Sequence, residues 1–388
     1  MEQKPAESEL LKMNKSEIKL SDRPSLSRLR RQIIINRTHG LVSRLTNLQT
    51  HKGRQAQIAE LEIRNLCLLL PEVLSEEPSC LSLDLTCPLN VVGDIYGHFT
   101  ELLQILAQLG HPPHVRYLFL GNFVGRGERS IETIALLFAY KLLYPKSIYL
   151  LRGNHESDRL GRLYGFYDEL RDRFSHRLWA SLMNAFNYLP VCAIIENVIF
   201  CSHSGISPCV HYSHCKSTKE LESYINRWIL RPSDVEANLL LTHFLWSEPD
   251  SETVGWTRNP CGLGYLFGPD EVRSFCDRFG FSLMIRSNNL VSGGFEFFAD
   301  NRLISIFTAP GYLKTYKNEA AIVNLVLYEK CNSIVCHIYS LKPTVNLSGT
   351  KSGRTTLIVS EAPTSDPSNL RLFQDDDLGE HFYHNLPV

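Results

Sequence analysis

The sequence lacks several features that would place it in a specialised class. It has no run of about 18 apolar residues, the length that a membrane-spanning helix requires. Its N-terminus is charged and has no apolar stretch, so we expect no secretory signal. The net charge is only −1, from 40 Lys and Arg against 41 Asp and Glu, whereas nucleic-acid-binding domains are usually strongly basic. We therefore expect a chain that engages neither a membrane nor nucleic acid.

Cysteine is present without the spacing that indicates a metal site or a disulfide framework. The 11 cysteines occur singly, and no CxxC pair is found. An odd number of cysteines without a secretory signal indicates reduced thiols, which predicts a cytoplasmic or nuclear protein. No internal repeat of about 20–50 residues is visible, so a solenoid or propeller is not expected.

Composition divides the chain into three zones. Residues 1–30 are polar and rich in Lys, Ser and Arg, which predicts a flexible tail that leads into a helix over about residues 31–48. Residues 346–388 are poor in apolar residues apart from TLIVS, which predicts a mostly disordered tail. Residues 31–345 carry dense apolar periodicity and can bury a substantial core, so they are expected to form the folded domain.

Within this domain, short apolar runs end in polar residues at Asp94, Asn122, Asn154 and His203. The first three are 28 and 32 residues apart, close to the length of a βαβ unit. Ligands of open α/β sheets bind beyond the carboxyl ends of the strands, so these four side chains should share one site. After Pro208 a helix-rich stretch precedes further β-rich segments, which predicts a second sheet packed on the first with helices outside.

The same residues resemble the signature motifs of the phosphoprotein phosphatase family. The family motifs GDxHG, GDxVDRG, LRGNHE and HGG correspond to Gly93–Gly97, Gly121–Gly127, Leu151–Glu156 and Ser202–Gly205. The resemblance runs from about residue 30 to residue 343, and Ile334–Pro343 looks like the last strand of the protein phosphatase 1 branch. It implies a calcineurin-like metallophosphoesterase fold with four α/β/β/α layers around two mixed sheets, and dephosphorylation of serine and threonine.

The resemblance also implies a two-metal centre, which the sequence retains only in part. In the family, two metal ions ~4 Å apart are bridged by a carboxylate and a hydroxide that attacks phosphorus. The ligands kept here are Asp94, Asn154 and His203, whereas Tyr96, Asn122 and Asn288 replace a His, the bridging Asp and a His. Because such metals prefer carboxylate or imidazole, we expect no metal, or a weakly bound divalent ion of the manganese, iron or zinc class.

The groups that would transfer protons and bind phosphate are also incomplete. His155 matches the acid that protonates the leaving group, but Gly125 replaces the Asp that orients it. Cys261 replaces one of two phosphate-binding arginines, a bidentate contact that a thiol does not reproduce. The phosphate-binding positions that remain are Arg126, Asn154 and Tyr312.

Two functions fit this pattern. The first is a pseudophosphatase that acts as a binding or scaffolding protein, and the second is an active or weakly active serine/threonine phosphatase with an altered metal site. A third option is a phosphopeptide reader that uses Arg126 and helix N-termini without hydrolysis. The kept residues also have ordinary structural explanations: Asp94 can cap a helix, and His155 and His203 can be core histidines.

The resemblance to the protein phosphatase 1 branch also implies a partner site. In that branch a hydrophobic groove takes an extended Arg-Val-x-Phe-type peptide, which adds a strand to a sheet edge. The matching positions, here called the partner groove, are Ile199, Leu283, Phe297, Ile304, Ile334, Val335, Cys336 and Ile338. All are apolar or Cys, although a basic groove position of the family corresponds to Asn301. We expect regulatory or targeting proteins, and also phosphoproteins, as partners; plain core packing would explain the same residues.

Overall fold

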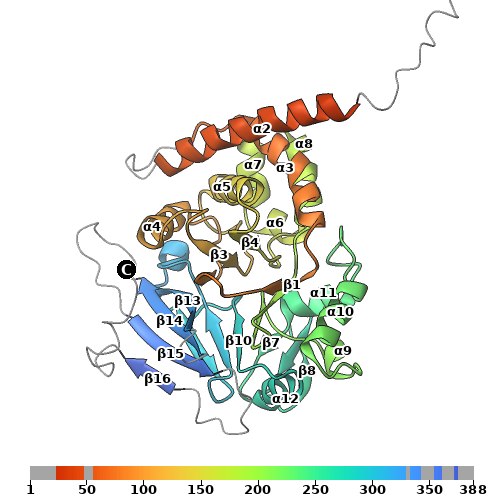
Figure 1. Ribbon diagram of the computed structural model, residues 1–388, viewed down its shortest axis with the longest axis vertical. Coiled ribbons are helices and arrows are strands. Elements are labelled where there is room, and N and C mark those ends of the chain that lie inside the picture. The colour runs from red at the N-terminus through yellow and green to blue at the C-terminus, as the bar shows by residue number, and fades with distance from the viewer. Residues whose placement is uncertain (1–22, 48–55, 329–332, 342–353, 361–370, 375–388) are drawn as a thin grey trace, which may run out of the picture.

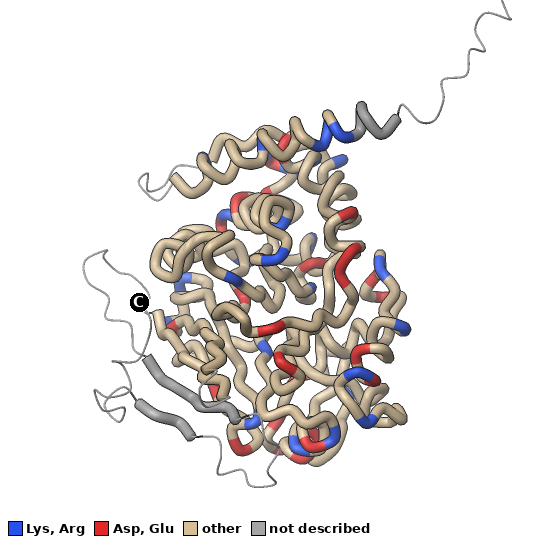
Figure 2. The backbone as a smooth tube through the Cα atoms, viewed as in Figure 1, with Lys and Arg blue, Asp and Glu red and all other residues tan. Residues whose placement is uncertain are grey.

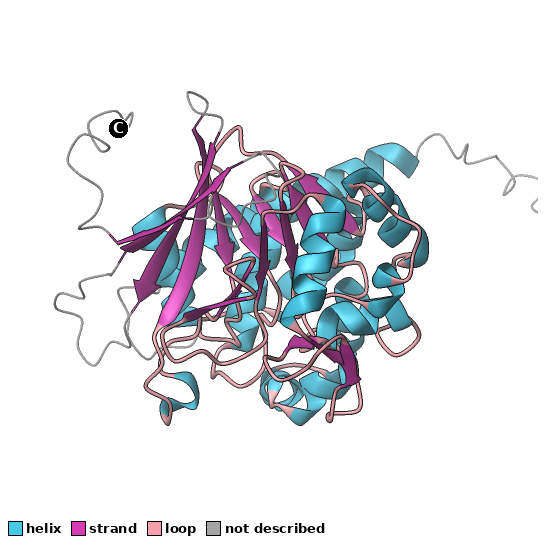
Figure 3. Cartoon of the chain, turned by 90° about the horizontal axis from the view of Figure 1, so that it is seen from below, coloured by secondary structure: helices cyan, strands magenta, loops and turns pink. Residues whose placement is uncertain are grey.

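A computed structural model describes residues 23–47, 56–328 and 333–341, together with the backbone of two further strands at 354–360 and 371–374. Two central sheets are formed by these residues, and helices lie on their outer faces (Figures 1 and 3). A small third sheet joins β7 (Glu248–Pro249), β9 (Tyr265–Phe267) and β8 (Trp256–Arg258). The four-layer α/β/β/α prediction is confirmed by this arrangement.

The first sheet has seven strands in the described residues, in the order β16-β15-β14-β13-β2-β3-β4. Its bounds are β2 (Leu89–Val92), β3 (Arg116–Phe119), β4 (Ile148–Leu150), β13 (Ala320–Tyr328), β14 (Ser333–Leu341), β15 (Arg354–Ser360) and β16 (Arg371–Gln374). The β2, β3 and β4 strands are parallel, and the others pair antiparallel. Parallel strands covered on both faces read as continuous apolar runs, which explains the sequences LNVV and RYLF.

The second sheet has six strands in the described residues, in the order β1-β5-β6-β10-β12-β11. Its bounds are β1 (Cys80–Leu83), β5 (Cys192–Ile195), β6 (Ile199–Ser202), β10 (Leu283–Arg286), β11 (Phe295–Phe298) and β12 (Leu303–Ile306). The core between the sheets contains Leu118 from β3 and Ile199 and Leu283 from the second sheet. Side chains alternate along a strand, so Tyr117 and Phe119 on either side of Leu118 pack instead under the helices.

Helices cover both outer faces, as Figure 1 shows. Those packed with the first sheet are α2 (Arg23–Thr46), α3 (Glu60–Ser75), α4 (Phe99–Leu109), α5 (Ser130–Leu143), α7 (Phe166–Arg173) and α8 (His176–Phe186). Those packed with the second sheet are α10 (Thr218–Trp228), α11 (Leu239–Trp246) and α12 (Pro269–Phe279). The short helices α6 (Asp158–Leu163) and α9 (Pro208–His211) complete these layers.

The structure adds detail at the two ends of the domain. The helix expected over residues 31–48 is α2, which begins at Arg23, because Pro24 is tolerated in a first helical turn. The C-terminal zone expected to be mostly disordered contains β15 and β16, since the β-branched run TLIVS pairs with the edge of β14. The remainder of both tails, 1–22 and most of 346–388, lies outside the described residues.

Charge is dispersed over the fold. Figure 2 shows basic and acidic residues interspersed along the described chain, in keeping with the near-zero net charge. No helix of the described residues is long and apolar enough to cross a membrane.

Candidate active site

The strand ends converge as the sequence predicts. Asp94 and Asn122 follow β2 and β3, and the Asn122 Nδ2 donates to the Asp94 Oδ2 over 2.9 Å. Asn288 follows β10 of the other sheet, and its backbone N–H donates to the Asp94 Oδ1 over 3.3 Å. His203 follows β6, with its Nδ1 at 3.8 Å from the same oxygen, and Asn154 donates to the Asn288 Oδ1 over 2.8 Å. The ends of both sheets therefore meet around one buried carboxylate, that of Asp94.

Asn122 occupies the position of the family's bridging Asp, and its amide orientation is fixed from both sides. Its Oδ1 accepts the backbone N–H of His155 at 2.9 Å, so its amino group must face the other way. There the Nδ2 contacts Asp94 at 2.9 Å and the Tyr96 hydroxyl at 3.0 Å. In the reversed orientation, the Asn122 oxygen would face the Asp94 carboxylate and the Asn122 amino group would face the His155 N–H, and both contacts would be repulsive. Asn122 therefore directs hydrogens toward Asp94, where the family places a cation.

Tyr96 replaces the first His ligand and is enclosed in the same site. Its side chain is buried, and burial followed by the negative charge of Asp94 raises the pKa of Tyr96 well above the usual tyrosine range. The phenol is therefore neutral at physiological pH and is not a phenolate ligand. Its ring lies 5.2 Å from that of Tyr312 and 5.9 Å from that of Phe307, centroid to centroid. Aromatic packing has thus replaced a ligand imidazole at this position.

The second half of the site retains two acceptors without partners. His203 contacts the carbonyl oxygen of Leu120 through Nδ1 at 2.9 Å, which leaves Nε2 unprotonated. Burial lowers the pKa of His203 despite the nearby Asp94, so the ring is neutral. Within the described residues, the buried His203 Nε2 and Asn154 Oδ1 accept no hydrogen bond. Such acceptors suit a water molecule or a cation.

Asn288 does not restore the missing imidazole. Its Nδ2 donates to Glu248 over 2.9 Å and to the Ser204 hydroxyl over 3.2 Å, so its amide is engaged in hydrogen bonds. Among the described residues, no group of three or more His, Cys, Asp or Glu side chains is placed to hold a metal ion. The donor set therefore does not fit the two-metal centre of the family: one carboxylate and one imidazole face neutral amides.

His155 lies in an apolar aromatic environment. Its ring stacks on Tyr164 at 5.1 Å and 14° and meets Tyr96 edge-on at 4.8 Å. Its Nδ1 contacts the Val124 carbonyl oxygen at 3.1 Å. Burial, and then the charge of Arg126, lower the pKa of His155 to about 3. The imidazole is therefore neutral near pH 7, and its one proton, on Nδ1, is donated to the Val124 carbonyl oxygen and not to a leaving group.

Gly125 is where the family's orienting Asp would stand, and the backbone there does not suit a side chain. Its φ is +87°, in the region that favours glycine. A Cβ at this position would lie 2.5 Å from the Nδ1 of His155, closer than real Cβ atoms approach. A side chain at this position would therefore collide with the His155 ring.

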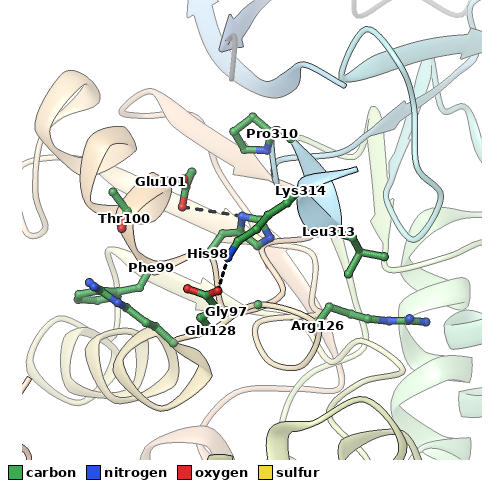
Figure 4. Close-up of a pocket in the computed structure, with 13 residues that line it drawn as sticks. Gly97, His98, Phe99, Thr100, Glu101, Arg126, Glu128, Pro310, Leu313 and Lys314 are labelled. Carbon is green, nitrogen blue, oxygen red and sulfur yellow. Dashed lines mark hydrogen bonds and ion pairs between the residues drawn. The ribbon is translucent and has the colours of Figure 1, made fainter. Parts of the chain in front are cut away.

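The phosphate-binding positions are also rearranged. The Arg126 guanidinium stacks over the Tyr164 ring at 3.4 Å, which satisfies it by a cation–π contact. Figure 4 shows its side chain extending away from Glu128 and Lys314. Cys261, in place of the second arginine, is exposed, and its thiol bonds the Leu263 carbonyl in its own loop at 3.3 Å.

Two buried charged residues support the site. Glu156 accepts the backbone N–H groups of Asn122, Phe123 and Gly153 at 2.8–2.9 Å, and burial raises its pKa to about 7. Arg286 was not predicted as a site residue. It is fully buried and donates to the Ser204 carbonyl, and burial lowers its pKa to about 10. Its only sequence signal is a charge that ends the apolar strand LMIR.

An open pocket of about 430 Å³ adjoins this site. Arg126 lines it together with His98, Glu101, Glu128 and Lys314. Lys314 is paired with Glu128, and His98 lies 3.8 Å from Glu101, as the dashed lines in Figure 4 mark. The lining carries charges of both signs, Arg126, Arg129 and Lys314 against Glu101 and Glu128, and of these Lys314 and Glu128 pair with each other.

The structure brings most of the partner groove together. Ile199, Leu283, Ile304, Ile334, Cys336 and Ile338 all belong to the core between the two sheets, and Phe297 packs against it. Val335 is buried but lies outside that cluster, since neighbouring residues of a strand point to opposite faces. β15 pairs with the outer side of β14, so β14 is not at the edge of the described sheet.

Comparison with known proteins gives the class of the chain. The family model described as calcineurin-like phosphoesterase matches residues 88–287, so the chain belongs to that family. Among solved structures, it is similar to a Saccharomyces cerevisiae protein serine/threonine phosphatase described as similar to human phosphatase PP5. That likeness has 25% identity and a TM-score of 0.66, and covers 75% of this chain and 92% of the other.

A cold-active protein-tyrosine phosphatase of a Shewanella species is a more distant match. It has 15% identity and a TM-score of 0.48, over 68% of this chain and 81% of its own. The match to the yeast phosphatase agrees with the phosphoprotein phosphatase resemblance of the motifs. The domain is thus a phosphoprotein phosphatase-like metallophosphoesterase domain.

Proposed function

We propose that this chain is a protein phosphatase 1-like pseudophosphatase that binds regulatory or targeting proteins without dephosphorylating them. The observation that carries the proposal is the orientation of Asn122. Its Oδ1 is held by the His155 N–H at 2.9 Å and its amino group by Asp94 at 2.9 Å. Asp94 thereby accepts hydrogen bonds from neutral donors, the Asn122 amide and the Asn288 backbone N–H.

The energetic consequence opposes a dinuclear centre. A cation beside Asp94 would face the amide hydrogens of Asn122, and turning the amide would break its hydrogen bonds to Asp94 and to the His155 N–H. A hydrogen bond to a charged group contributes about 1.5–3 kcal/mol, and a neutral one about 1 kcal/mol. This loss of hydrogen bonds adds to the effect of the missing metal ligands. In metal sites, the loss of even one supporting contact lowers metal affinity or activity by about 10–100-fold.

Proton transfer is impaired independently of the metals. A general acid needs a pKa near the working pH, whereas burial lowers the pKa of His155 to about 3. Gly125 provides no carboxylate that could raise it. A restored metal site alone would therefore not restore turnover.

The proposal is tested by metal content and hydrolysis measured on the same preparation. We expect elemental analysis after incubation with Mn²⁺ and desalting to find well under two metals per chain. We also expect no hydrolysis of p-nitrophenyl phosphate or a phosphoserine peptide above a preparation carrying Asp94→Asn. Two bound metals with turnover that Asp94→Asn abolishes would overturn the proposal.

A second candidate, a weakly active phosphatase with one bound ion, is favoured by one observation. The unpartnered His203 Nε2 and Asn154 Oδ1 are acceptors of the kind that hold a divalent cation, and Asp94 lies beside them. Calorimetry with Mn²⁺ or Zn²⁺ would then show one site, lost in His203→Ala and kept in a variant of the exposed His214. No binding at millimolar metal would remove this candidate.

A further inference from the structure

Strand β14 is paired along both sides. On one side its whole length pairs antiparallel with β13, from Ser333 opposite Tyr328 to Leu341 opposite Ala320. On the other side β15 pairs with seven of its residues, Ser333 to Tyr339, also antiparallel. β16 then pairs with β15, as the blue strands in Figure 1 show. The side on which an added peptide strand would hydrogen-bond is thus taken by the chain itself.

The register places β15 against the partner groove. Ile334, Cys336 and Ile338 of the groove are opposite Val359, Leu357 and Thr355. Directly opposed residues of an antiparallel pair share a face, so the positions of Leu357 and Val359 fall on the groove side. In an Arg-Val-x-Phe peptide the two apolar residues are also two apart, and alternate residues of a strand share a face.

The three β14 groove residues are no more than 1% exposed and pack in the core between the two sheets, on the face that Leu357 and Val359 share by register. From these observations we infer that Arg354–Ser360 is the resident occupant of the partner groove, a tethered strand that a partner peptide must displace. The inference rests on the proposed partner-binding function and deepens it. Incoming partners would compete with this segment for the same backbone hydrogen bonds of β14.

Tethering decides how strong the competition is. Residues 342–353 connect β14 to β15, so the strand is never far from its site. A short tether gives an effective concentration on the order of millimolar. If only about 1–10% of molecules have the groove open, the apparent dissociation constant of a partner peptide rises by roughly 10–100-fold.

The test uses the full chain and a fluorescent Arg-Val-x-Phe peptide, with binding measured by calorimetry and anisotropy. Leu357→Asp with Val359→Asp should release β15, because charges would replace both apolar residues on the groove side. Leu230→Asp with Val254→Asp is the matched control, since these side chains are 71% and 86% exposed. We expect at least 10-fold tighter peptide binding by the released variant only, lost again on adding Phe297→Ala.

Equal micromolar binding by parent, control and released variant would overturn the inference and leave the partner function standing. No binding at millimolar peptide by any of them would remove the partner function instead. Amide hydrogen exchange along β14 then tests, without any peptide, whether β15 is paired with it. Slow exchange in the parent that becomes fast in the released variant supports its occupancy, and fast exchange in the parent refutes it. If the variant with both Asp substitutions does not fold, the same assays use Ile358→Pro instead. Proline removes a backbone N–H donor from the strand pairing of β15.

Discussion

Returning the bridging carboxylate by Asn122→Asp is the sharpest test of how this site is stabilised. The substitution would place a second carboxylate about 3 Å from that of Asp94, where the amide now donates at 2.9 Å. Two charges at that distance repel by about 5 kcal/mol at an effective dielectric constant of about 20. The two buried carboxyl groups can instead share one proton, which removes the repulsion. The loss in the free energy of unfolding is therefore limited to the free energy needed to keep one carboxyl group protonated.

That limit gives the magnitude. Holding a proton on a carboxyl of pKa about 4 at pH 7 costs about 1.4 kcal/mol per pH unit, or about 4 kcal/mol. We therefore expect Asn122→Asp to lower the free energy of unfolding by about 3–4 kcal/mol at pH 7. The raised folded-state pKa of the pair means that the loss shrinks as pH falls toward 4, where the unfolded chain is protonated too.

The assay is urea unfolding of parent and variant at pH 5 and pH 8, with and without Mn²⁺, and Asn36→Asp on the exposed face of α2 as the control. The variant should gain stability with Mn²⁺ while the parent and the control do not. Parent-like stability of Asn122→Asp at pH 8 without metal would refute the reasoning, because Asp94 would then not depend on the amide.

Three further outcomes follow from the supporting contacts. Gly125→Ala should lower stability by about 2–4 kcal/mol, because its Cβ would meet His155 at 2.5 Å; Gly165→Ala, with φ +89° and open space, should lose only about 1 kcal/mol, as thermal melts would show. The His155 imidazole, with a pKa of about 3, should show constant NMR shifts from pH 5 to pH 8, and a midpoint near pH 6.5 would contradict its burial. Glu156, whose pKa is raised to about 7, should make stability fall as pH rises from 4.5 to 7, and Glu156→Gln should remove that slope while costing about 1–3 kcal/mol at pH 5.

Much of the fold could be predicted from sequence because its signals are local. The apolar runs before Asp94, Asn122 and Asn154 mark buried parallel strands, and their spacing leaves room for one crossover helix each. The convergence of these side chains follows from topology, since parallel strands end at the same edge. β15 was missed because TLIVS is short and lies in a polar context, and its pairing depends on a distant edge of β14.

The state of the site could be predicted only in part. Substitution at the ligand positions is visible in the sequence, but how each replacement is satisfied depends on geometry. The packing of His155 beside Gly125 depends on the backbone turn and on the rings of Tyr96 and Tyr164. Arg286 could not be singled out, because only the packing of β10 reveals that its charge is buried beside the site.

The replacements act together to make the metal-free site stable. A family member without its metals would hold like charges at adjacent carboxylates, and such a site is costly to fold. Here Asn122 removes one charge and donates to the other, and the neutral Tyr96 contacts the same amide at 3.0 Å. The fold then needs no cation to close its catalytic edge. A chain that no longer depends on metal can keep its binding surfaces folded under conditions that would remove the metal from an active phosphatase. Unchanged stability of the chain in a metal chelator therefore distinguishes a site stabilised without metal from a site that has only lost its activity.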